Sequence, residues 1–478
     1  MKKITLCFLI LFQFSICAFS QKASVKWGDI ISDEKQTKFN ILGEDENSIY
    51  IFRFQHDHKD ISIPFLVIVN KKSLEITKSK ELQFPVPEDG DLHLHNVFFL
   101  KDKFVMFVSL TNTKNKTDRA LAYEVSKNGD VNSKYTVVLE KENAPKDGTN
   151  FRFVITPDST RFVAIANVYN NYKAAAFDKD MNGLWAGEFT LTAEKKSEDI
   201  WERGLETDMN ANLFVFYIGS GTNTMLFSYN GKDKEVKRFD IIPTSKTECI
   251  FQNTGRFIHD EDGLLAYVNL YGNKTHEDAY GVAIVKYADG NIQTLYKPFS
   301  TKLRTAFMSD SKAAKPGEEV GYIVLDDVIE NFDKSFDVII HEFAPRVFNA
   351  AAATMYDKNW NEVWSAPVAI RYTKLDEYFW FANMITKNEL CFLFIDHRNN
   401  VDNLDSRSSR WLADLDHGVS VLARISLKDG SIKKEPLFTS NELETYLMPY
   451  KCVQSGSNSM LLFGKKKSEI RFGKLTIE

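Results

Sequence analysis

The segment Ala174–Trp185, AAAFDKDMNGLW, decides the fold because it holds a β strand, a tight polar turn and the start of a second strand. Its apolar run stops at Asp178, and the Asn-Gly pair that follows is typical of a hairpin turn between antiparallel strands. The segment Ala352–Trp364, AATMYDKNWNEVW, has the same layout. The hairpin is therefore a repeated element of this chain, and internal repeats decide an architecture.

Further hairpins of this kind recur along the chain. With the two above they form a series of seven: 67–84, 122–139, 174–191, 225–242, 282–299, 352–370 and 421–438. Each is preceded by another pair of β runs with a short polar turn. The repeating unit therefore has four strands, here named A to D, and recurs at roughly 50 to 70 residues, as in propeller blades.

The two ends of the chain complete one further unit. After the seventh unit, the β runs 447–453, 460–463 and 470–477 supply strands A, B and C without a D. The run 24–30 is a D-like strand with no partner before it. Pairing these ends would close a ring and leave no open edge. We predict an all-β chain folded as one eight-bladed β-propeller over residues 21–478. Seven blades remain the alternative because the sixth unit is irregular.

The repeats at 174–185 and 352–364 resemble those of secreted bacterial propeller proteins of the β-propeller superfamily. The resemblance covers residues 24–478 and concerns architecture only. The chain has no Gly-His and Trp-Asp signature of WD40 repeats and no Asp box of sialidases. The resemblance therefore implies a propeller without assigning it to a functional family, and it replaces the three domains that the length alone would suggest.

The first twenty residues read as a bacterial secretory signal. Lys2 and Lys3 precede the apolar run 4–16, and the small residues Ala18 and Ser20 lie just before Gln21. The large Ile16 disfavours a lipoprotein anchored at Cys17. We therefore expect an exported protein, periplasmic or extracellular, without a membrane span and monomeric.

Charge and cysteine content exclude some functions. Residues 21–478 contain 58 basic and 65 acidic side chains, a net charge of −7, which argues against nucleic-acid binding. Three cysteines remain after the signal, Cys249, Cys391 and Cys452, each within an apolar run. An odd, sparse set is no disulfide framework, so buried free thiols are expected.

Long connections are predicted on the face that carries the B–C and D–A loops. The longest are expected at 326–346 and 397–416, with smaller insertions at 111–118 and 271–278. Long loops on one face of a rigid scaffold favour a binding surface. The Asp178-x-Asp180-x-Asn182 motif opens like a calcium loop, but it lies in a C–D hairpin on the other face and is interpreted as a turn.

Two sets of candidate ligand-binding side chains map to the loop-bearing face. Arginines near the expected starts of A strands could bind a carboxylate, sulfate or phosphate, or could simply pair with acidic residues of a neighbouring blade. Aromatic residues there could stack on sugar rings, although blade cores also consist of aromatics. The candidates are Arg152, Arg203, Arg304, Tyr378, Trp380 and His397.

A transition-metal site is a further possibility. Alternate residues of a strand point the same way, so His56-x-His58 and His93-x-His95 could each present two imidazoles together. Exposed loop histidines explain the same pattern. A divalent metal is a possible cofactor, although the main interpretation requires none.

No catalytic signature stands out in the sequence, so the catalytic residues stay unknown. The main hypothesis is an exported, non-enzymatic propeller that binds an envelope or extracellular protein, peptide or glycan through its loop-bearing face. The alternative is a propeller-fold lyase or hydrolase acting on an acidic polysaccharide, possibly assisted by a metal, with Arg, His and Tyr side chains around the channel.

Overall fold

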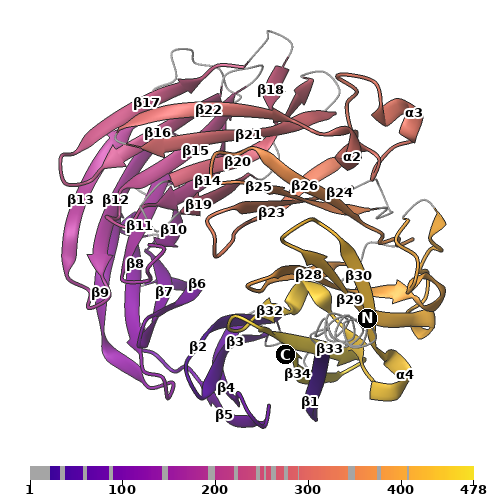
Figure 1. Ribbon diagram of the computed structural model, residues 1–478. Helices are drawn as coiled ribbons and strands as arrows, with labels where there is room; N and C mark the ends of the chain where they lie inside the picture. Colours follow the sequence, from indigo (N-terminus) through magenta and orange to yellow (C-terminus); the bar gives the residue numbers. More distant parts are fainter. Residues whose placement is uncertain are drawn as a thin grey trace, which may run out of the picture.

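The structure is a ring of eight antiparallel sheets, one per blade, so the chain is an eight-bladed β-propeller (Figure 1). The computed structural model describes residues 22–478 except 33–37, 57–61, 86–89, 113, 143–148, 169, 192–199, 220–223, 244–247, 252–254, 260–264, 274–277, 289, 343–349, 374–377 and 406–407. The predicted fold is confirmed, and the seven-bladed alternative is wrong.

Each blade runs outward from its A strand in the order A-B-C-D. The first four blades are β2 (Lys38–Glu44), β3 (Ser48–His56), β4 (Ser62–Asn70), β5 (Ile76–Glu81); β6 (Asp91–Leu100), β7 (Lys103–Asn112), β8 (Thr117–Val125), β9 (Val131–Glu142); β10 (Asn150–Ile155), β11 (Arg161–Val168), β12 (Asn171–Asp178), β13 (Gly183–Thr190); and β14 (Ile200–Thr207), β15 (Leu213–Gly219), β16 (Thr224–Asn230), β17 (Glu235–Ile241).

Blades 5 and 8 have A strands in two pieces, and short helices interrupt the later connections. Blades 5 to 8 are β18 (Glu248–Ile250) with β19 (Arg256–His259), β20 (Leu265–Asn273), β21 (Ala279–Ala288), β22 (Asn291–Pro298); β23 (Ile323–Glu330), β24 (Phe336–Glu342), β25 (Ala351–Tyr356), β26 (Glu362–Val368); β27 (Phe381–Ile385), β28 (Glu389–His397), β29 (Gly418–Ser426), β30 (Ile432–Thr439); and β31 (Tyr446–Leu447) with β32 (Val453–Gln454), β33 (Ser459–Lys466), β34 (Glu469–Ile477), β1 (Ala23–Ser32). The helices are α2 (Thr301–Arg304), α3 (Asp310–Ala313), η1 (Arg398–Asn400), η3 (Leu415–His417), α4 (Ser440–Leu443) and η4 (Pro449–Lys451).

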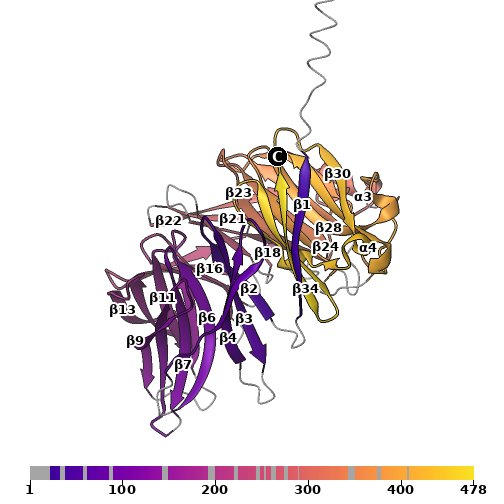
Figure 2. The same ribbon diagram turned by 90° about the horizontal axis from the view of Figure 1, so that it is seen from below.

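The N-terminal strand closes the ring as the sequence predicts. Strand β1 pairs antiparallel with β34, from Ala23 opposite Ile477 to Ser32 opposite Glu469, and Figure 2 shows the two strands side by side. The Trp27 ring lies against Gly473, where an added Cβ would come within 2.6 Å of a ring carbon. Closure therefore rests on both a ladder and a fitted aromatic ring.

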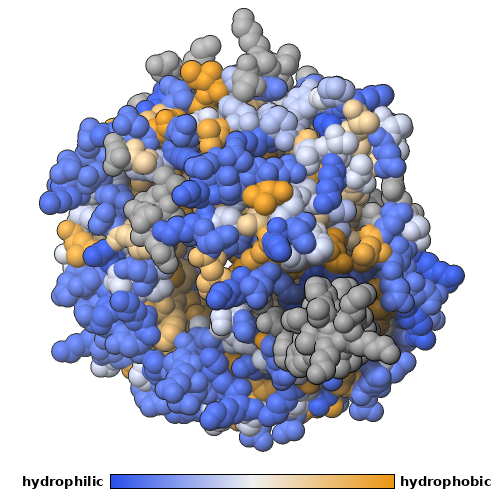
Figure 3. All heavy atoms as spheres, in the orientation of Figure 1, coloured by the Kyte–Doolittle hydropathy of each residue, from blue (hydrophilic) through white to orange (hydrophobic). Residues whose placement is uncertain are grey.

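The face of the ring seen in Figure 3 is largely polar. Figure 3 shows a hydrophilic face with hydrophobic residues in small separate groups and a hollow near the middle of the ring. Among the described residues, no helix has the length and apolar character needed to cross a membrane.

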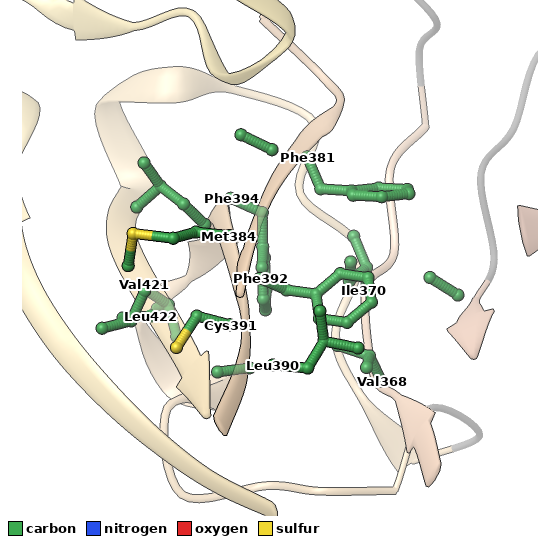
Figure 4. Close-up of a cluster of buried hydrophobic side chains, with 14 of the residues drawn as sticks. Val368, Ile370, Phe381, Met384, Leu390, Cys391, Phe392, Phe394, Val421 and Leu422 are labelled. Carbon is green, nitrogen blue, oxygen red and sulfur yellow. The ribbon is translucent and has the colours of Figure 1, made fainter. Parts of the chain in front are cut away.

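The core lies between blades rather than in one centre. Buried clusters join each pair of neighbouring blades, and blade 4 shows how: Val215 of β15 packs toward blade 3, whereas its neighbour Phe216 packs toward blade 5. Because B and C strands are buried on both faces, they read as continuous apolar runs. Figure 4 shows the cluster of blades 6 and 7, which includes the free thiol Cys391. Cys391 and Cys452 are buried as predicted, whereas Cys249 is half-buried.

Several hairpin turns share a five-residue design that differs from the predicted one. In Asp178–Asn182, Oδ1 of Asp178 accepts the N–H of Asp180 and of Asn182, both at 2.9 Å, and Oδ2 accepts from the Asn182 side chain. The positive φ is at Met181 (64°), not at Gly183. The Asn-Gly pair therefore marks this turn without supplying its left-handed residue. Because both carboxylate oxygens of Asp178 are engaged within the turn, its interpretation as a turn is confirmed.

The predicted long loop at 326–346 is wrong. Residues 326–342 form most of β23 and all of β24, joined by the short turn 331–335, and residues 343–346 lie outside the described part of the chain. The polar residues Asp326, Asp327 and Asp337 interrupt the apolar pattern here, although all three belong to strands. The insertion expected at 111–118 shrinks to residues 113–116 between β7 and β8. The long connection that enters blade 6 is instead 299–322, which carries α2 and α3.

Candidate functional site

The two faces of the ring carry connections of very different length. Between the described strands, every A–B and C–D connection has five residues or fewer. The opposite face carries the connections 299–322, 369–380 and 398–417, which follow one another around blades 5, 6 and 7. The predicted one-sided loops are confirmed there for 397–416, and they concentrate in one sector of the ring.

A buried ion pair holds the longest of the blade 7 connections. The Lys434 ammonium donates to Oδ2 of Asp396 at 2.9 Å, and each side chain is 1 % exposed. Lys434 also donates to the backbone oxygens of Ala369 (3.1 Å) and Asn400 (3.5 Å). It thereby ties β30 to β28 and to the starts of connections 369–380 and 398–417. We call these contacts the Lys434 anchor.

The side chain of Asn400 extends the anchor into the connection. Its Nδ2 donates to Oδ1 of Asp396 and to the oxygen of Arg410, both at 2.8 Å, and its Oδ1 accepts the N–H of Arg410 at 2.8 Å. The backbone of connection 398–417 is therefore fixed at both sides. A preorganised loop loses less entropy when it binds a partner.

The anchored connection presents aromatic and basic side chains at the surface. Trp411 is 36 % exposed, and the Arg371 guanidinium lies 4.2 Å from its ring centroid. The phenol of Tyr446 donates to Oδ1 of Asp416 at 2.7 Å, and its ring is 6.0 Å from that of Tyr378. We call the side chains of Arg371, Tyr378, His397, Arg410, Trp411 and Tyr446 the blade 7 surface.

Two predicted binding residues belong to this surface and one does not. His397 ends β28, where its Nδ1 accepts the N–H of Asn399 at 3.1 Å; desolvation, followed by Arg410, lowers its pKa. Tyr378 lies beside Tyr446. Trp380 instead packs on the ring of His341, 4.8 Å between centroids, and forms part of the packing between blades.

The three predicted arginines do not form a ring of free guanidinium groups. Arg152 of β10 makes a two-pronged ion pair with Glu202 of the next blade, whose Oε2 also accepts from Tyr172 at 2.7 Å. Pairing with an acidic residue of a neighbouring blade is the alternative to ligand binding that the sequence analysis gives for these arginines. A hollow of about 470 Å³ adjoins the pair, lined also by His95 and Asn96.

Arg304 was expected near the start of an A strand, and that placement is wrong. It lies in α2, is 7 % exposed, and its Nε donates to the Ala313 oxygen at 3.0 Å, which joins α2 to α3. An interior arginine with a backbone partner supports the connection rather than a ligand. The side chain of Arg203 lies outside the described residues.

The structure places the predicted histidines only in part. His58 and the side chain of His56 lie outside the described residues. His93 is exposed on β6, whereas His95 shares a hydrogen bond of 2.8 Å with Ser109 and packs 5.6 Å from the Phe153 ring. Within the described part of the chain, no three His, Cys, Asp or Glu side chains lie close enough together to hold a metal ion. The four-histidine metal site stays a prediction.

The channel-facing A strands carry bulges that the sequence did not suggest. The ladders of β6, β14 and β23 each shift by one residue, and the extra residues are His95, Arg203 and Asp326. Bulges re-aim side chains and recur next to functional sites. Polar residues inside otherwise apolar A strands are the sequence signal that could have revealed them.

Two half-buried carboxyl groups of the A strands have raised pKa values. Burial raises the pKa of Glu206 and of Asp326 to about 7. Glu206 lies 4.0 Å from Nε2 of His259 in the next blade, and Asp326 lies 3.5 Å from Nδ1 of His341. Burial lowers the pKa of His341 to about 4, so His341 is neutral at pH 7, and the positive charge that acts on Asp326 is that of Arg256.

These carboxyls predict a pH dependence of stability. A folded pKa of about 7 exceeds the unfolded value of about 4, so the folded state binds more protons between these values. The free energy of unfolding should fall by about 2–4 kcal/mol between pH 5.5 and 8.5, as measured by urea unfolding. The variant Glu206→Gln/Asp326→Asn should show a flatter profile. An unchanged profile in that variant would assign the dependence to other groups.

Comparisons with known proteins assign the chain to no family. No family model and no curated protein sequence matches the chain. Similar solved structures include the WD40 domain of SCAP from fission yeast, with a TM-score of 0.43 and 9 % identity over 95 % of this chain and 98 % of that one. A prolyl endopeptidase has a TM-score of 0.43 and 9 % identity over 91 % of this chain and 55 % of that one, so this chain spans about half its length. The propeller domain of the Trilobed protease from Pyrococcus furiosus has a TM-score of 0.35 and 10 % identity over 80 % of this chain and 93 % of that one.

Proposed function

We propose that the protein is exported and acts as a non-enzymatic binding protein whose blade 7 surface captures an envelope or extracellular protein, peptide or glycan. The observation that carries this proposal is the Lys434 anchor: a fully buried ion pair fixes a long connection that exposes aromatic and basic side chains. Aromatic residues and arginines are the side chains that dominate binding energy at interfaces.

Export is part of the proposal and has its own test. The signal segment 1–20 and Cys17 lie outside the described residues. Expression of the full chain in a Gram-negative host should yield a protein that begins at Gln21 in the periplasm or medium, as mass spectrometry would measure. A cytoplasmic product that retains Met1 would contradict export.

Binding is tested with a matched pair of surface substitutions. Trp411→Ala removes the exposed ring of the blade 7 surface. Phe332→Ala removes a ring that is 64 % exposed in the A–B turn on the opposite face. Glycan arrays and peptide display would first identify ligands of the unaltered protein. Trp411→Ala should then weaken their affinity at least about 10-fold, whereas Phe332→Ala should not.

The reverse result would place binding on the tight-turn face and contradict the proposal. The alternative of a lyase or hydrolase acting on an acidic polysaccharide has less support. Arg152 is paired with Glu202, and Arg304 is buried within the connection 299–322, so neither is presented to a uronate carboxylate.

A further inference from the structure

The A–B turn of blade 6 contains buried oxygen atoms with no hydrogen-bond partner. Asp337 of β24 is 0 % exposed, and neither of its carboxylate oxygens accepts a hydrogen bond of normal geometry, although the Asn331 side chain is near enough to lower its pKa. Asn331, the first residue of the turn 331–335, is 4 % exposed, and its Oδ1 accepts none either. Leaving such groups unsatisfied in the interior costs free energy, so the arrangement calls for an explanation.

This turn differs from its counterparts in the same chain. In the turns that begin at Asp178, Asp208 and Asp357, Oδ1 of the first residue accepts two backbone N–H groups of the turn. In 331–335 the first side chain turns inward, and its Nδ2 donates to the Ser335 hydroxyl at 2.9 Å. Backbone capping passes to Asp333, whose Oδ1 accepts the Ser335 N–H at 3.0 Å and the Ser335 hydroxyl.

The chemistry of these side chains is that of a hard-cation site. Oxygen-bearing side chains recur at every second residue, Asn331, Asp333, Ser335 and Asp337. Two carboxylates and an amide oxygen match the ligands of Ca²⁺, which accepts bidentate carboxylates and irregular geometry. The set has no nitrogen or sulfur donor of the kind that zinc favours. Mg²⁺ usually retains several waters, which the full burial of Asp337 disfavours.

We propose that the turn 331–335 and Asp337 form a binding site for one Ca²⁺ ion. Both oxygens of Asp337, Oδ1 of Asn331 and the carboxylate of Asp333 are its side-chain ligands. The ion supplies a positive charge next to the buried Asp337, since the charged group that acts on Asp337 is the exposed Asp333, of the same sign. The turn 331–335 resembles a calcium loop less than Asp178–Asn182 does. In Asp178–Asn182, however, both carboxylate oxygens of the first residue accept hydrogen bonds within the turn, whereas Oδ1 of Asn331 accepts none.

The site would stabilise the packing between blades 6 and 7. In the ladder, Asp337 lies opposite Ile329 of β23 and Met355 of β25. Both of these belong to or pack against the buried cluster that joins blades 6 and 7. Binding of Ca²⁺ would therefore stabilise the blades from which the connection 398–417 projects. This inference does not depend on the proposed function.

The experiment compares stability with and without calcium. Protein freed of metal by EDTA and gel filtration is titrated with CaCl₂ in a calorimeter, and its thermal unfolding is followed at pH 7.5. We expect one Ca²⁺ per chain and a rise in Tm of about 3 °C at a concentration near 100 times Kd. MgCl₂ should give a smaller rise.

Two substitutions decide whether the proposed ligands are responsible. Asp337→Asn keeps the shape and removes a buried charge, so in EDTA it should be at least as stable as the unaltered protein and should not respond to CaCl₂. Asp357→Asn, in a counterpart turn, should retain the calcium response. Absence of calcium binding in the unaltered protein, or an undiminished response in Asp337→Asn, would overturn the proposal.

A third result would also overturn the calcium proposal and would show that Asp337 is protonated instead. Burial raises its pKa to about 7. If calcium has no effect, and stability falls more steeply from pH 6 to 8 in the unaltered protein than in Asp337→Asn, the group is a protonated carboxyl.

Discussion

Deletion of residues 22–32 is expected to open the ring and to lower the stability of the protein drastically. Without β1, strand β34 becomes an exposed edge along its whole length, from Glu469 to Ile477. The Trp27 ring also leaves Phe438, whose centroid is 5.5 Å away, and the guanidinium of Arg471 loses its 2.6 Å bond to the Gly28 oxygen. The loss should exceed the ~3–5 kcal/mol of a single buried aromatic truncation, and the edge should promote aggregation.

The test is thermal unfolding of chains that begin at Gln21 and at residue 33, with Trp27→Ala as the intermediate case. Adding a synthetic peptide of residues 22–32 should restore part of the lost Tm, because the ladder can form between separate chains. A truncated protein that melts within about 2 °C of the intact one would show that closure contributes little, whatever the pairing of the strands.

Ring closure was predictable from the sequence because each strand and each hairpin turn has a signal in its own short stretch of residues. Hairpin turns and apolar runs recur at a regular period, and the unpaired strand at 24–30 complements the three strands after residue 446. Blade 6 was misread for a physical reason. Strand β23 contains Asp326 as the extra residue of a bulge, and strand β24 contains the buried Asp337. These polar residues interrupt the apolar pattern from which the strands are predicted.

The candidate site was less predictable because it depends on partners far apart in the sequence. Arg152 and Arg304 have similar positions in the sequence pattern. In the structure, however, Arg152 pairs with Glu202 of the next blade, whereas Arg304 lies inside the connection 299–322. His397 and Tyr378 lie on the blade 7 surface because both adjoin long connections. Nothing local in Lys434 shows that it reaches Asp396, 38 residues away, and becomes fully buried.

Replacement of Lys434 by Met is expected to lower the free energy of unfolding by about 3–5 kcal/mol. Removing one partner of a buried ion pair leaves the other charge uncompensated in the interior. Asp396 would keep only the Asn400 amide and its own backbone neighbour His397 as donors. Ala369 and Asn400 would lose the ammonium that holds the two connections together. Urea unfolding measures the loss, and hydrogen exchange should show faster exchange across 398–417.

The double variant Lys434→Met/Asp396→Leu separates the charge from the anchoring. Removing both charges should recover much of the stability, because a buried pair often contributes little relative to apolar residues of similar size. It should not recover the order of connection 398–417, since the bonds to Asn400 and Ala369 remain absent. Binding of ligands found for the blade 7 surface should therefore stay weak even where stability returns. A double variant that binds as well as the unaltered protein would show that the anchor serves stability alone. A loss of less than about 1 kcal/mol of unfolding free energy in Lys434→Met would show that Asp396 is hydrated or protonated without its lysine.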